Sequence, residues 1–144
     1  MEWNDSADRA LISEAFERWA TAVLGRDRAA VERMHDDEFR VRLGSRLLTK
    51  QEHVTLELAV DHAEMRLVDV EATRRVGNIL LAWTTHFIRV NALPQLPSLG
   101  LTGDWGNEAL AKRGFMQGEL SVWRHEGDHI RCLAFDIGSF QPGS

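Results

Sequence analysis

Asp136 and His86 are the two residues whose types and positions best suit proton transfer. Asp136 lies in the last apolar segment of the chain, and in a regular strand it would share a face with Cys132 and Ala134. If that face is interior, loss of hydration raises the pKa of the carboxyl toward a value useful to a general acid or base. The alternative is that Asp136 ends the strand and accepts hydrogen bonds from the backbone or an arginine.

His86 lies within the segment 79–90, which is rich in β-branched and aromatic residues. Because histidine titrates near neutral pH, a pocket-facing His86 would share a proton relay with Asp136. The alternatives are a core histidine bonded to a carbonyl or hydroxyl group, and a residue at a dimer face. A slip of one residue in strand register would move His86 to the opposite face.

Four tryptophans are candidate walls of an apolar ligand pocket, because an indole ring offers a large flat surface. They are Trp19, Trp83, Trp105 and Trp123. Packing in the first predicted helix alone explains Trp19, and Trp83 and Trp123 equally suit an intersubunit contact. Trp105 lies in a glycine-rich loop, where it either closes over a ligand or anchors the loop.

The segment from His35 to Glu38 is a cluster of metal-ligand residue types, whereas His125 and His129, which flank a predicted hairpin turn, make no convincing site. The segment spans a predicted helix end and turn and shows no partner at ligand spacing, so we expect a solvated acidic turn. The sequence contains no phosphate-binding loop, zinc-protease motif or nucleophile elbow. Cys132 has no recognisable catalytic partners, so we expect it to be a small buried apolar residue. We therefore expect no metal and no cofactor.

The helices that would position these residues lie in the first 60 residues. Apolar residues recur three or four apart at 11–24, as on one face of an amphipathic helix. Asp27 is a suitable N-cap for a short second helix. Thr49 and Glu52 form a capping box for a third helix that should run to about Val60.

Strands make up most of the remaining chain. A short strand is predicted at 39–43, and two hairpins at 67–90 and 115–137. The proline- and glycine-rich loop 91–114 between the hairpins is long for a connection, and a short helix at 107–112 fits within it. The order predicts an α+β fold in which a curved antiparallel sheet wraps around about three N-terminal helices, making a cone with an internal pocket.

This pattern resembles the nuclear transport factor two-like superfamily and, within it, the SnoaL-like branch. The matching residues are Trp19, Ala22, Gly25, Arg26, Asp27, Asp36, Asp37, Phe39, Gly44, 48–52, 130–136 and Ser139. The resemblance implies a single domain over residues 1–144, frequent homodimers and a deep pocket. Members include isomerases, dehydratases, epoxide hydrolases, polyketide cyclases and proteins without catalysis. In SnoaL-like cyclases an aspartate in the region of Asp136 is the general acid/base.

The sequence contains no tyrosine, which reduces the number of catalytic mechanisms that the resemblance implies. The tyrosine-based sites of the ketosteroid isomerases and dehydratases of this superfamily cannot be assembled in their familiar form. For the Asp-Arg-Asp arrangement of the epoxide-hydrolase branch, Asp69 is the only strand candidate for the second aspartate. Its face is ambiguous, because a bulge near Leu67 and Val68 would turn it to the other side of the sheet. The mechanism that remains uses one aspartate as both acid and base, in a pocket whose walls include tryptophan side chains.

Composition limits the partners. The net charge is −5 and basic residues are scattered, so we expect no nucleic-acid partner. The apolar runs are too short for a membrane span, and a single cysteine suits a reducing, cytoplasmic location. We expect a homodimeric isomerase, cyclase or lyase acting without metal on a hydrophobic or polycyclic carbonyl compound. The alternative is a non-catalytic ligand-binding or protein-association domain of the same fold.

Overall fold

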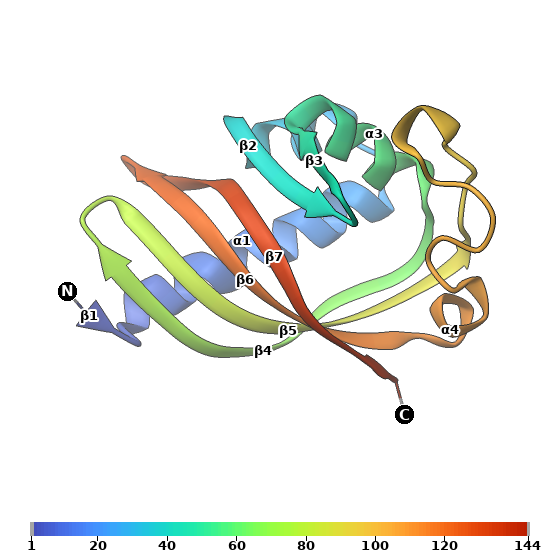
Figure 1. The fold of residues 1–144 in the computed structure, drawn as a ribbon. Coiled ribbons are helices and arrows are strands. Elements are labelled where there is room, and N and C mark those ends of the chain that lie inside the picture. Colours follow the sequence, from blue (N-terminus) through green and yellow to red (C-terminus); the bar gives the residue numbers. More distant parts are fainter. Residues whose placement is uncertain (1, 144) are drawn as a thin grey trace.

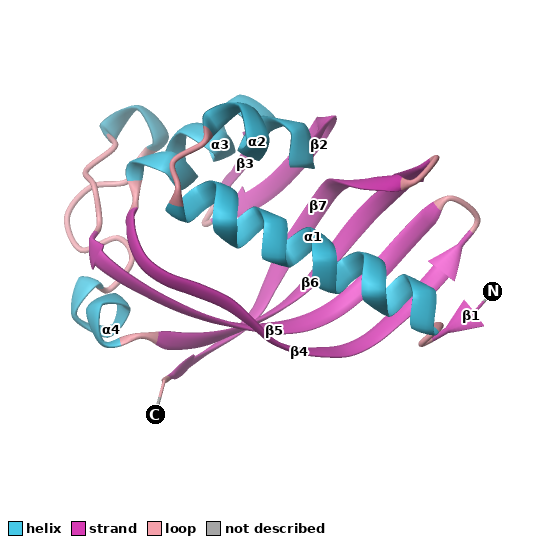
Figure 2. Cartoon of the chain, turned by 180° about the vertical axis from the view of Figure 1, so that it is seen from behind, coloured by secondary structure: helices cyan, strands magenta, loops and turns pink. Residues whose placement is uncertain are grey.

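The computed structural model describes residues 2–143, except for the side chains of Ser139 and Phe140. Its longest helix, α1 (Ser6–Leu24), lies along the concave face of a curved sheet (Figures 1 and 2). The helix begins after Asp5, whose side chain accepts hydrogen bonds from two backbone amides of the first turn. Its buried face meets the sheet, as the apolar periodicity predicted.

Two shorter helices lie at one end of α1, near each other in both views (Figures 1 and 2). α2 (Arg28–Met34) begins after Asp27, whose carboxylate accepts a hydrogen bond from a backbone amide. α3 (Lys50–Ala59) begins at the predicted capping box, with both reciprocal hydrogen bonds of Thr49 and Glu52 present. The three predicted N-terminal helices are confirmed, and none of the helices in residues 2–143 is long and apolar enough to cross a membrane.

Within the described residues, seven strands form one sheet in the order β1-β4-β5-β6-β7-β2-β3. The strands are β1 (Glu2–Trp3), β2 (His35–Leu43), β3 (Arg46–Thr49), β4 (Asp61–Val76), β5 (Ile79–Ala92), β6 (Phe115–Glu126) and β7 (His129–Pro142). Neighbours are antiparallel except β2 and β7, which both enter the sheet from the same end and are parallel. The predicted α+β cone is confirmed, with a mixed sheet in place of a purely antiparallel one.

β-Bulges bend the long strands and change which side chains face the helices. Between β6 and β7 the pairing moves from Trp123–Cys132 to Val122–Ala134, so Leu133 is an extra residue in β7. Further register shifts occur along β4 and β5. The strands consequently curve around α1 (Figure 2).

The segment between the hairpins is structured. A single turn of 3-10 helix, η1 (Pro97–Leu99), lies beside a short bridge between Leu96 and Leu101. Gln95 bonds both backbone groups of Gly103 through its side-chain amide. The helix α4 (Glu108–Arg113) confirms the short helix predicted at 107–112, shifted by one residue.

Candidate functional site

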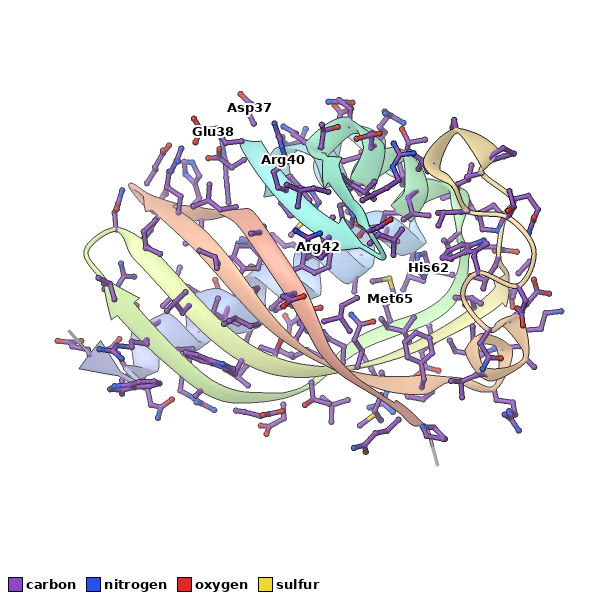
Figure 3. All side chains as sticks on the ribbon, viewed as in Figure 1. Asp37, Glu38, Arg40, Arg42, His62 and Met65 are labelled. Carbon is purple, nitrogen blue, oxygen red and sulfur yellow. The ribbon has the colours of Figure 1, made fainter. Side chains whose placement is uncertain are left out.

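An apolar cavity of about 260 Å³ lies between the helices and the concave face of the sheet. Apolar side chains from both sides line it, including Phe16 of α1, Ile88 of β5 and Phe135 of β7. Ligand pockets are usually roughly 300–1,000 Å³, so the volume of this cavity lies near the lower end of that range. His62 and Met65 extend into it from β4 (Figure 3).

A first group of polar side chains belongs to the sheet, and three of its members, His86, Gln117 and Glu119, line the cavity. Thr84 and His86 of β5 lie directly opposite Glu119 and Gln117 of β6. The His86 Nε2 atom is 2.8 Å from Thr84 Oγ1 and 3.5 Å from Glu119 Oε1. The Gln117 side-chain amide donates to Glu119 Oε2 at 3.0 Å. Among the described residues, Glu119 Oε1 has no hydrogen-bond partner.

Burial changes the protonation of both ionisable members of this group. Desolvation raises the pKa of Glu119 to about 7. The hydrogen bond from Gln117 lowers this pKa and the charge of Glu57 raises it, and both effects are smaller than that of desolvation. Desolvation lowers the pKa of His86 to about 4. Near neutral pH the Glu119 carboxyl therefore exchanges a proton readily beside an uncharged imidazole, which is the state a general acid or base requires.

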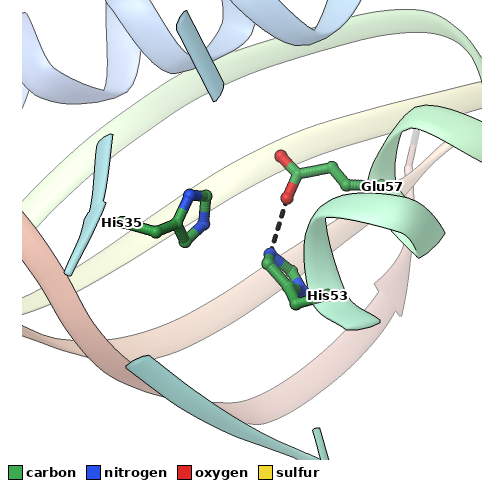
Figure 4. A group of neighbouring side chains, drawn as sticks. All are labelled: His35, His53 and Glu57. Atoms are coloured by element: carbon green, nitrogen blue, oxygen red, sulfur yellow. Dashed lines mark ion pairs between the residues drawn. The ribbon is translucent and has the colours of Figure 1, made fainter. Parts of the chain in front are cut away.

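A second group of polar side chains lies in the wall on the helix side (Figure 4). His53 and Glu57 are one turn apart on α3, with His53 Nε2 2.6 Å from Glu57 Oε2. The indole N–H of Trp19 donates to Glu57 Oε1. His35, at the start of β2, faces this pair, and its Nδ1 atom is 2.7 Å from the carbonyl oxygen of Val31.

No protein-family model and no curated protein matches the sequence. Solved structures do match. An NTF2-like protein from Cytophaga hutchinsonii has a TM-score of 0.67 at 12% identity, covering 91% of this chain and 97% of that one. A conserved protein from Planctomyces limnophilus has a TM-score of 0.69 at 17% identity, covering 96% and 100%. A nuclear transport factor 2 (NTF2-like) superfamily protein from Salmonella enterica has a TM-score of 0.60 at 12% identity, covering 96% and 94%.

The chain has the NTF2-like fold. At these identities the likeness concerns the fold alone, since one fold carries many functions. The chemistry must therefore be inferred from the side chains that this chain places on the NTF2-like cone.

The structure does not place Asp136 in the cavity. Because Leu133 is an extra residue in β7, the alternation reverses after Cys132, and Phe135 and Ile137 line the cavity instead. Asp136 is exposed and borders a hollow on the opposite, convex face of the sheet. The expectation that Asp136 shares an interior face with Cys132 is wrong, and no relay with His86 is formed.

His86 does face the cavity, but its carboxylate neighbour is Glu119. Sequence reasoning missed Glu119 because the inner face of β6 carries polar residues at every second position, from Gln117 to Ser121. A polar face is normally typical of solvent exposure, so the residue pattern contains no signal of a carboxyl group that faces a cavity. The proton-transfer role of His86 stays a prediction.

The four tryptophans separate into three environments. Trp19 and Trp105 line the cavity, and the Trp105 indole N–H donates to the carbonyl oxygen of Pro94 at 2.7 Å, which anchors the loop. Trp123 is fully buried in the core and does not line the cavity. Trp83 lies on the convex face, stacked on Trp3 with ring centroids 5.6 Å apart.

The expected solvated turn at His35 to Glu38 is wrong for half of its length. The segment begins β2, and His35 and Asp36 are buried, with Asp36 bound to Arg124 at 3.0 Å. Asp37 and Glu38 extend outward, as expected (Figure 3). The sequence pattern shows no partner for His35, whereas the fold places His53 and Glu57 beside it; their spacing of four on a predicted helix was the available signal.

The raised pKa of Glu119 predicts a pH-dependent stability difference between the wild type and Glu119→Gln. The folded protein holds this proton up to about pH 7, against an ordinary pKa of 4.5, so the stabilisation is full below 4.5 and is lost as pH rises through 7. Glutamine has no such dependence. Between pH 4 and pH 8 the variant should gain about 3 kcal/mol in unfolding free energy relative to the wild type.

Urea unfolding of both proteins across that pH range measures this difference. Other titratable groups around Glu119 are His86 on β5, Glu57 on α3 and Cys132 on β7. They are present in both proteins, so their contributions largely cancel. Parallel stability curves would show that Glu119 titrates alike in the folded and unfolded chains.

Proposed function

We propose that the protein binds a small, largely apolar carbonyl compound in the cavity, and that Glu119 moves a proton at the carbon next to the carbonyl group. One observation supports this most directly: a buried carboxyl group lines an apolar cavity with one oxygen, Oε1, free of hydrogen bonds among the described residues. A base in such a site removes a proton without competition from bulk water.

The neighbouring side chains suit this role. Gln117 binds the other carboxyl oxygen of Glu119 and so leaves Oε1 directed to a ligand. An uncharged His86 lies close enough to exchange a hydrogen bond with Oε1 when the ligand approaches. His62 also lines the cavity, and its imidazole offers an N–H group to the carbonyl oxygen, where negative charge develops.

The first step is the same for each reaction class considered. Glu119 takes the proton from the α-carbon, and the C–H electron pair forms an enolate. Return of the proton to another carbon gives an isomerase, loss of a β-substituent gives a lyase, and attack of the enolate on a second carbonyl gives a cyclase. The small cavity favours isomerisation or elimination of a compound with one ring or none.

The proposal also covers the domain organisation, the oligomeric state and the location of the protein. The chain would act as one SnoaL-like domain over residues 1–144, as a homodimer in the cytoplasm. The exposed Trp3 and its stacked partner Trp83 support a subunit contact on the convex face, because contiguous apolar patches on a protein surface often mark interaction sites. The same surface also suits the alternative, a protein-association domain.

Deuterium exchange tests the catalytic proposal without knowledge of the product. A panel of small cyclic and open-chain ketones is first screened for an increase in the melting temperature of the protein. Each binder is then incubated with the protein in D₂O, and loss of the α-proton NMR signal is followed. Catalysed exchange supports proton transfer, whereas binding without exchange supports a ligand-binding protein.

A further inference from the structure

His35, His53 and Glu57 bring three ligand-type side chains together from β2 and α3. The three offer one ligand atom each, and these atoms lie within 4.8 Å of one another. His35 is only 1% exposed, and His53 and Glu57 are each 7% exposed. Two atoms bound to one ion at about 2.0–2.2 Å are at most about 4.4 Å apart, so small side-chain movements would close the site.

Neighbouring groups orient two of the three candidate ligands, His35 and Glu57. The carbonyl oxygen of Val31 accepts from His35 Nδ1–H, which leaves the lone pair on Nε2, and this buried atom has no hydrogen-bond partner among the described residues. The indole N–H of Trp19 occupies Glu57 Oε1 and leaves Oε2 available. Carbonyl and N–H groups placed behind ligand atoms in this way are typical of metal sites.

The contact between His53 and Glu57 supports the same conclusion. Their Nε2 and Oε2 atoms are 2.6 Å apart but lack the alignment of a hydrogen bond. The ion pair of the buried Glu57 is with His53, whose imidazole carries a positive charge only when it is protonated. A buried carboxylate is costly without a compensating positive charge, and a bound cation supplies one.

We propose that His35, His53 and Glu57 bind one divalent transition-metal ion in the wall of the cavity. Two imidazoles and a carboxylate suit Zn²⁺ or Fe²⁺, whereas Mg²⁺ and Ca²⁺ prefer oxygen ligands. His53 and Glu57 line the cavity, so an open coordination position would face it. The site uses different side chains from the proton transfer assigned to Glu119 and stands independently of it.

Cobalt binding to the untagged chain tests the site. After dialysis against a chelator, the protein is titrated with Co²⁺ and its visible absorption recorded, and Zn²⁺ is then added as a competitor. We expect one Co²⁺ per chain with the intense bands of a four- or five-coordinate ion, displacement by Zn²⁺, and a melting temperature that rises with Zn²⁺ concentration. Failure of the wild type to bind Co²⁺, or weak binding of several ions, overturns the site.

Matched variants locate the ion. Glu57→Gln and His53→Gln keep side-chain volume and should lower the affinity for Co²⁺ by at least about tenfold. His129→Gln, which removes an exposed imidazole on the β6–β7 hairpin, should bind as the wild type does. Loss of binding in His129→Gln, or retention in folded Glu57→Gln, contradicts the assignment. If the cavity variants do not fold, X-ray absorption of the wild-type Co²⁺ complex decides by showing or excluding two imidazole ligands.

Glu119→Gln separates the two proposals, because it should slow proton exchange by about 10²–10⁴-fold and leave Co²⁺ binding unchanged. Loss of exchange with cobalt binding retained supports both. Cobalt binding without any ketone exchange in the wild type leaves the metal site standing and removes the proton-transfer function.

Discussion

Replacing Glu119 by glutamine is expected to slow α-proton exchange of a bound ketone by about 10²–10⁴-fold, the usual contribution of a general base. Glutamine keeps the shape of the side chain and accepts the hydrogen bond from Gln117, so ligand affinity should change little. The only group lost is the titratable carboxyl in the apolar cavity. Exchange rates come from NMR in D₂O, and affinities from the ligand-dependent melting temperature.

Asp136→Asn is the matched comparison, since it removes the carboxylate that the sequence pattern favoured. Asp136 is exposed on the convex face, away from the cavity, so exchange should proceed at the wild-type rate. A loss of exchange in Asp136→Asn with Glu119→Gln unaffected would restore the original assignment of the base and reject Glu119.

Replacing Trp123 by alanine is expected to lower the free energy of unfolding by about 3–5 kcal/mol, the usual cost of deleting a large buried aromatic ring. Trp123 is 0% exposed and packs edge-on against Phe16, with ring centroids 5.3 Å apart. Its indole N–H also donates to Ser121 Oγ at 2.8 Å, a bond that alanine cannot make. Urea unfolding followed by circular dichroism measures the loss.

Trp83→Ala provides the control on the other face of the sheet. Trp83 is partly exposed and packs against the exposed Trp3, so the monomer should lose less than half as much stability as with Trp123→Ala. Equal losses in the two variants would mean that Trp83 is as buried in solution as Trp123, as a subunit contact would make it.

Local signals in the sequence were sufficient for most of the secondary structure. The apolar stripe of α1, the cap at Asp27 and the capping box of Thr49 and Glu52 each act within a few residues, and each has the predicted outcome. The order of helices before hairpins was enough to predict the α+β cone. It could not predict the parallel pairing of β2 with β7, which joins segments about 95 residues apart in sequence.

The candidate site depends on tertiary contacts between distant segments, which the local sequence pattern does not predict. His35 meets His53 and Glu57 only because β2 and α3 pack together. The polar residues on the inner face of β6 follow a pattern that is normally typical of solvent exposure.

The sequence by itself determined the helices, their caps, the hairpins and hence the cone. The tertiary structure decided which carboxylate enters the cavity. A strand pattern with a period of two holds only while the register is unbroken, and the extra residue Leu133 breaks it without any distinctive residue type. That single insertion turns Asp136 outward, while the uninterrupted pairing of β5 with β6 leaves Glu119 facing His86 inside the cone.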